Sequence, residues 1–266
     1  MTAAPTPAPS PAGRATGSGG GAAPARQRVL AQASFEVGSL LRNGEQLLVS
    51  LVLPALALVG LSMTSVPSLG VGRRIDLAVP GVLALCVVSA AFTAQAISTG
   101  FDRRYGVLRY LGVTPLGRGG LVVAKALATL AVVAVQLVVM AVLGLVLGWQ
   151  PAAGGVVWAL VFVVVGTWAF VALAMLLAGT LRAEAVLALA NLVWVLLLGL
   201  GGVIVPRSEL PAGLSHVAAV LPSAGLADGL RSALVHGSLN LPALMVVLGW
   251  GVVATVLAAR FFRFDD

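Results

Sequence analysis

Long stretches of uncharged, apolar residues follow one another along the chain, and the short segments between them hold most of the charge. Each stretch has about 20 residues or more, the length that an α-helix needs to cross the hydrocarbon core of a bilayer. Together with a mean hydropathy of +1.06, this pattern predicts an all-α membrane protein with six transmembrane helices. The expected spans are residues 46–66, 77–99, 119–147, 155–181, 185–205 and 241–259.

A different pattern precedes the first span. Between residues 28 and 45, Leu30, Ala33 and Val37 recur at helical spacing, whereas Gln32 and Glu36 fall on the other side. Such a helix is expected to lie in the membrane interface, although an ordinary lead-in to the first span fits the same pattern. Residues 1–27, rich in Ala, Pro and Gly, predict a disordered cytoplasmic tail. The expected organisation is this tail, a transmembrane domain over residues 28–262 and a short cytoplasmic tail over residues 263–266.

Charge narrows the class of protein. Only 9% of the residues are charged, too few to cover the surface of a soluble domain, in which roughly 25% is usual. The net charge is +7, but the basic residues are scattered between apolar blocks and form no face that could follow nucleic acid. Eleven arginines fall on the side of the predicted membrane that holds the termini, against four on the other side. This bias predicts that both termini are cytoplasmic.

Titratable groups are almost absent from the predicted spans. The exception is Lys125, near the cytoplasmic end of the third span, from where its ammonium is expected to reach the headgroups. Proton-coupled carriers and intramembrane hydrolases need titratable or metal-binding groups at depth, so both classes are disfavoured. The single Cys86, with no partner cysteine, indicates neither a disulfide nor a metal site.

The polar side chains inside the spans are neutral. They are Ser89, Thr93 and Gln95 on the second span, Gln136 on the third and Asn191 on the fifth. These residues are candidates for lining a pathway. Tight helix packing with interhelical hydrogen bonds explains the same residue types, and the sequence leaves both interpretations open.

The segment after the second span is basic and amphipathic. Phe101, Tyr105 and Leu108 share one helical face, and Asp102 and Arg103 lie away from it. Such a segment on the cytoplasmic side can lie on anionic lipid or dock a protein partner.

This segment also carries a resemblance to a known family. Its residues Arg103, Gly106, Leu108, Arg109, Leu111, Thr114, Pro115, Leu116, Arg118 and Lys125 follow the pattern RxxGxLRxLxxTPLxRxxxxxxK. The pattern is similar to the stretch after the second span of ABC-2 type transporter permeases, a family that includes multidrug exporters. Residues 40–54 resemble the family's interfacial helix before the first span. The Pro-punctuated segment from Pro206 to Gly237 resembles its outer loop, which forms short helices in the outer leaflet.

The resemblance implies a membrane subunit of an ATP-driven exporter in a bacterial plasma membrane. The segment after the second span would be a coupling helix that contacts a separate ATPase subunit, and a second permease subunit, identical or related, would complete the pathway. The coupling role falls on Arg103, Arg104, Gly106, Leu108, Arg109, Thr114 and Pro115, with Arg42 and Glu45 of the interfacial helix as weaker candidates.

The chain has no phosphate-binding loop of the form GxxxxGK[ST], because its one lysine, Lys125, lies between two alanines. We therefore expect this chain to be no enzyme and to hold no cofactor, with ATP and Mg²⁺ bound by the partner. Spans without fixed charge favour a hydrophobic or lipid-like substrate. A channel or facilitator that needs no ATP, or a structural membrane scaffold, is the alternative.

Overall fold

The computed structural model describes residues 23–42, 44–108 and 115–262, and the described part is built from helices without strands. The predicted tail over residues 1–27 therefore lies almost wholly outside it. The elements are α1 (Ala25–Arg42), α2 (Gly44–Met63), α3 (Arg74–Val88), η1 (Ser89–Ala94), α4 (Gln95–Arg104), α6 (Gly117–Val146), η2 (Ala153–Gly155), α7 (Val156–Thr180), α8 (Ala183–Leu200), η3 (Arg207–Glu209), α9 (Ala212–Ala219), α10 (Pro222–His236) and α11 (Leu241–Phe261).

The predicted all-α membrane protein is confirmed. Five helical stretches in the described residues are long and apolar enough to cross a bilayer: residues 74–104, 119–146, 153–180, 183–200 and 241–261. The first predicted span corresponds to α2, whose apolar part, Ser50–Met63, is shorter. Six spans were expected, and length and apolar composition support five of them.

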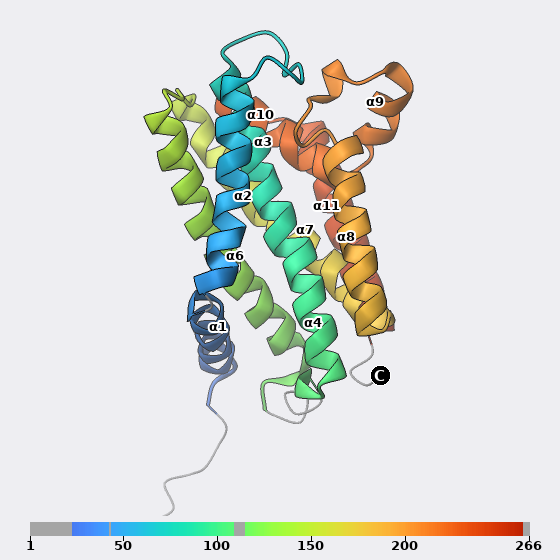
Figure 1. Ribbon diagram of the computed structural model, residues 1–266. Helices are drawn as coiled ribbons and strands as arrows, with labels where there is room; N and C mark the ends of the chain where they lie inside the picture. The colour runs from blue at the N-terminus through green and yellow to red at the C-terminus, as the bar shows by residue number, and fades with distance from the viewer. Residues whose placement is uncertain (1–22, 43, 109–114, 263–266) are drawn as a thin grey trace, which may run out of the picture.

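The second span forms the centre of the bundle. Helices α3, η1 and α4 run on as one rod from Arg74 to Arg104, and 72% of its most apolar 18-residue window is buried. Helix α2 lies on one side of this rod and α8 on the other (Figure 1). In α8 and α11 only 22% of the corresponding window is buried. Their exposed leucines and valines are the side chains that a surrounding bilayer would solvate.

Small residues allow the helices behind the central rod to approach closely. Helix α11 packs along α7, and a Cβ atom at Gly251 would overlap the ring of Trp168. Helix α10 meets α7 in the same way, because a Cβ atom at Gly229 would overlap the ring of Phe162. These contacts fix the positions of α7, α10 and α11 through steric fit rather than through charge.

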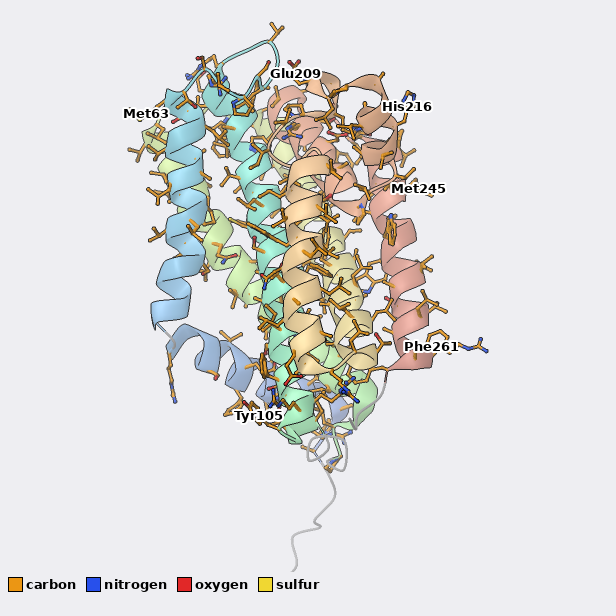
Figure 2. The ribbon with its side chains drawn as sticks, turned by 45° about the vertical axis from the view of Figure 1, so that its right-hand side comes forward. Met63, Tyr105, Glu209, His216, Met245 and Phe261 are labelled. Carbon is orange, nitrogen blue, oxygen red and sulfur yellow. The ribbon has the colours of Figure 1, made fainter. Side chains whose placement is uncertain are left out.

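Helix α1 lies across the lower end of the bundle, below α2, and packs against α6 (Figure 2). This placement agrees with a helix in the membrane interface. Its apolar side chains do not all point toward the bundle. Phe35 is 72% exposed, whereas the carboxylate of Glu36 points toward α6. A buried ammonium on α6 explains the inward carboxylate, as described below.

The upper end of the bundle contains the expected short helices, α9 and α10. Helix α10 packs between α3, α7 and α11 and is largely buried. Its Arg231 donates to the carbonyl oxygens of Gly202 at 2.6 Å and Val203 at 2.5 Å. Arg231 thereby ties α10 to the segment that follows α8.

Candidate functional site: a cavity between α2, α6 and α8

A cavity of about 650 Å³ lies where the central rod faces α2, α6 and α8. Its size falls within the range of pockets that hold drug-sized ligands, about 300–1,000 Å³. Apolar side chains supply most of its wall, among them Leu53 and Ala57 of α2, Val132 of α6 and Leu198 of α8. Helix α1 closes its lower end with Gln32, Phe35, Glu36 and Ser39.

The wall on the central rod is not a regular α-helix. Residues Ser89–Ala94 form a π-helical turn between α3 and α4, and Ser89, Ala90 and Ala94 line the cavity. Such turns widen the helix locally and occur frequently at functional sites. Here the turn brings the Ser89 hydroxyl to Trp194 of α8, whose Nε1 donates to it at 2.9 Å.

The lower end of the cavity holds a buried ion cluster. Lys125 Nζ lies 2.9 Å from Asp102 Oδ2 and 3.5 Å from Glu36 Oε1, and Gln32 Nε2 donates to Glu36 Oε1 at 3.0 Å. Lys125 is 4% exposed. The expectation that its ammonium extends to the headgroups is therefore wrong, because two carboxylates on α1 and α4 already compensate its charge.

A neutral hydrogen-bond network lies above the ion cluster. Gln95 Nε2 donates to the Thr99 hydroxyl at 2.9 Å, and the Thr129 hydroxyl lies 2.8 Å from Gln95 Oε1. This network joins α4 to α6. About two turns further along α6, Gln136 is 3% exposed and lines the same cavity, but its Oε1 has no hydrogen-bond partner among the described residues.

Below the cavity, α4 ends in a turn that is partly exposed. Tyr105 is 70% exposed, its ring stacks on Phe101, and Gly106 has a left-handed φ of +74°. The chain passes from this turn to Val107, which lines the cavity, and to Leu108, which is fully buried. The turn therefore touches both the cavity and the lower surface of the domain.

A sequence model of the ABC-2 type transporter family matches residues 28–235. The chain belongs to the ABC-2 type transporter family. No curated protein matches the sequence. The matched region is the membrane component of such transporters and is not itself catalytic. Members of this family normally work with an ATPase partner.

The ABC-2 fold brings three of the five predicted pathway residues together. Ser89, Gln95 and Gln136 line the cavity. Thr93 is not part of its lining, and its Oγ1 is buried without a described partner. Asn191 lies outside the cavity on the exposed side of α8, where its amide donates to Leu187 O at 2.8 Å.

The predicted coupling residues divide into buried and exposed groups. Arg103 is 6% exposed and donates to the carbonyl oxygens of Ala178 at 2.8 Å and Leu181 at 2.6 Å, so it anchors the end of α7. Leu108 is also buried. Arg104 is exposed and pairs with Glu184 at the start of α8. The helical spacing alone predicted that Arg103 lies on the outer face of α4. The carbonyl groups that accept its hydrogen bonds belong to the end of α7, a different span.

The other candidates are only partly described. Pro115 and Arg42 are exposed, and Gly106 lies at the turn. Arg109 and Thr114 lie outside the described residues, as does the side chain of Glu45.

Sequence reasoning did not identify Glu36, Asp102 or Trp194 as parts of a site. The i, i+4 spacing of Gln32 and Glu36 is a signal for one helix face. It does not reveal that Lys125 of α6, far along the chain, lies opposite that face.

Proposed function

We propose that this chain is the permease subunit of an ATP-driven exporter in a bacterial plasma membrane, with both termini cytoplasmic. In this proposal a separate subunit binds ATP and Mg²⁺, and the cavity between α2, α6 and α8 is part of the substrate pathway. The family membership supports the kind of machine, and the arginine bias of the sequence supports the orientation.

The observation that carries the proposal is the continuity between the cavity and the turn after α4. Asp102 and Val107 line the cavity, and Tyr105 lies between them in the chain with its side chain exposed. A partner that moves this turn would therefore move the cavity wall. Such a partner shifts the population of cavity shapes only if it binds one shape better than the other.

The coupling residues take two roles in this proposal. Arg104, Tyr105 and Gly106, with Pro115 across the loop, offer the surface that the ATPase would contact. Arg103 and Leu108 hold the turn on the bundle, so that displacement of the turn reaches α7 and the cavity. Arg109 and Thr114 keep the coupling role that the resemblance implies.

A second permease subunit would complete the pathway, and α8 offers a surface for it. Asn191 carries an amide on a face that is otherwise apolar, with Leu192 54% and Val195 56% exposed. A polar amide that faces lipid loses hydrogen bonds, whereas the same amide at a helix contact gains them. We place the contact between subunits on this face.

The substrate in this proposal is hydrophobic or lipid-like, because the cavity wall is mainly aliphatic. A ligand is stabilised by about 25 cal/mol for each Å² of its apolar surface that moves from water onto such a wall.

The test is association with the ATPase. The tagged chain is co-expressed with an ABC ATPase from the same source, and the complex is isolated in detergent. We expect Tyr105→Glu to reduce recovery of the ATPase at least tenfold, because it places a carboxylate at the centre of the exposed turn. The control is Phe261→Glu, which alters an exposed aromatic residue at the same end of the bundle but on α11 (Figure 2). Equal recovery with both variants would refute the assigned contact.

A further inference from the structure

We propose that the cavity between α2, α6 and α8 selects amphipathic cations: molecules with an apolar body and one protonated, hydrogen-donating amine. The inference rests on the proposed function in taking this cavity as the substrate site, and it adds the chemistry of the substrate. Three observations lead to it, and each concerns a different part of the cavity.

The first observation is the charge of the lower end. Among the described residues that line the cavity, the charged side chains are Glu36, Asp102 and Lys125. Among these described lining residues, two carboxylates stand against one ammonium, so this part of the lining carries one negative charge in excess. Glu36 and Asp102 side chains are 15% and 30% exposed, so solvent screens this charge only in part.

The two arginines next to Asp102 in the chain, Arg103 and Arg104, are engaged elsewhere. Arg103 donates to the carbonyl oxygens of Ala178 and Leu181. Arg104 pairs with Glu184. Neither arginine lines the cavity. A cationic ligand would therefore find a favourable site beside Glu36 and Asp102, and an anionic ligand would be repelled.

The second observation is the unpaired amide of Gln136. Its side chain lines the cavity on α6, is 3% exposed, and has an oxygen without a hydrogen-bond partner in the described part of the chain. Gln95 of the neighbouring α4 has both ends of its amide occupied. A buried amide oxygen without a partner has lost its hydrogen bonds to water and gained none in return. A ligand that donates a hydrogen bond at this level supplies the missing partner.

The third observation is the aliphatic and aromatic wall between these groups. Leu53, Pro54 and Ala57 of α2 face Trp194 and Leu198 of α8 across the cavity. This wall has no ionic partner for a phosphate or carboxylate. It suits a flat or flexible hydrocarbon body whose amine reaches the acidic end or Gln136.

The test uses four pyrene probes with the same apolar body. The amine, 1-pyrenemethylamine, is a cation at neutral pH; 1-pyrenemethanol is a neutral donor; 1-methylpyrene is neutral without a donor; and 1-pyrenecarboxylate is an anion. The full chain is placed in nanodiscs of zwitterionic phosphatidylcholine. Binding is measured by energy transfer from Trp194 to pyrene, taken as the difference between the unmodified chain and Trp194→Phe. Taking this difference removes the energy-transfer signal of probe that is dissolved in the lipid.

We expect the amine to bind at least tenfold more tightly than the alcohol, the alcohol several-fold more tightly than methylpyrene, and the carboxylate most weakly. Glu36→Gln, which keeps the shape of the side chain, should reduce the advantage of the amine over the alcohol to less than threefold and leave the alcohol unchanged. The matched control is Glu209→Gln, which removes one negative charge at the opposite end of the bundle (Figure 2) and should alter no affinity. Gln136→Leu should weaken the amine and the alcohol alike, but not methylpyrene.

Equal affinity for amine and alcohol, or preference for the carboxylate, would overturn the proposed selectivity. The probe series on the unmodified chain, with Trp194→Phe as its reference, decides this even if the Glu36 and Gln136 variants fail to fold. Absence of Trp194-dependent transfer with every probe would remove the cavity as a ligand site. Because binding needs no ATPase, these outcomes are independent of the association test with Tyr105→Glu.

Discussion

Lys125 Nζ lies 2.9 Å from Asp102 Oδ2, and this ion pair joins the inner part of α6 to the last turn of α4. Glu36 extends the pair to α1. The three helices that would enclose the cytoplasmic end of the substrate pathway therefore meet at one ammonium. Removal of that ammonium leaves two carboxylates close together and partly shielded from water.

Lys125→Met is predicted to destabilise the chain by about 3–5 kcal/mol, the usual loss when one partner of a buried ion pair is removed, because it leaves two partly buried carboxylates without a counterion. The measurement is thermal unfolding of the purified chain in detergent. Adding Asp102→Asn to Lys125→Met should restore part of the loss, since it removes one of the repelling charges.

The control for this prediction is Arg104→Met, which breaks the exposed pair with Glu184. Exposed pairs contribute about 0–1 kcal/mol, so a smaller loss is expected. If both single variants lost the same stability, the ion cluster at Lys125 would contribute no more to stability than the exposed pair of Arg104 and Glu184.

Gly251→Ala is predicted to destabilise the packing of α11 on α7 by about 1–3 kcal/mol, because the new methyl group overlaps the ring of Trp168. Gly249→Ala on the same helix is the matched control, since a Cβ atom there meets nothing within 4 Å. It should be neutral or slightly stabilising, because Ala favours a helix more than Gly does. Unfolding midpoints that rank the two variants in the opposite order would contradict the observed packing.

Arg231→Met is predicted to loosen the segment after α8. Arg231 donates to Gly202 and Val203 and, at 3.3 Å, to Ile204, and Ile204 lines the cavity. With Cys86→Ala as background, the labelling rate of Ile204→Cys by a membrane-impermeant maleimide reports the opening of this segment. We expect at least a tenfold increase with Arg231→Met and a smaller one with Arg231→Lys, which keeps the charge but not the fork of donors. An unchanged rate would mean that Arg231 does not hold this segment closed.

Asn191→Cys is predicted to form a disulfide-linked dimer in the membrane, provided that the second subunit is a copy of this chain packed on α8. The variant is made in the Cys86→Ala background and treated with a mild oxidant. Leu160→Cys, 58% exposed on α7, is the control that should remain monomeric. Equal cross-linking at both positions would remove the contact from α8.

The architecture was predictable because long apolar stretches have few alternatives to transmembrane helices. The position of α1, the long α6 and the short helices α9 and α10 all agree with patterns in the sequence. The weaker prediction was the first span, where α2 begins at Gly44 but its clearly apolar part starts at Ser50. Apolar length alone does not decide whether such a helix crosses a bilayer.

The cavity was less predictable, because it depends on which helix faces are opposed. Ser89, Gln95 and Gln136 could be named from their polarity inside apolar spans. The partnership of Lys125 with Glu36 and Asp102 could not, since it joins three helices that are distant in sequence. Arg103 shows the same limit: its charge suggested the surface, and the carbonyls of Ala178 and Leu181 hold it inside.

In the proposed mechanism, ATP binding by a partner changes the shape of the cavity, and one labelling measurement tests this claim without knowledge of the substrate. Val132→Cys, on the cavity wall, is made with Cys86→Ala and reacted with a small membrane-impermeant thiosulfonate in nanodiscs. In complex with the ATPase, a non-hydrolysable ATP analogue should change the labelling rate at least fivefold, and the chain alone should show no response. The same rate with and without nucleotide in the complex would contradict the claim and favour a pathway that does not depend on ATP.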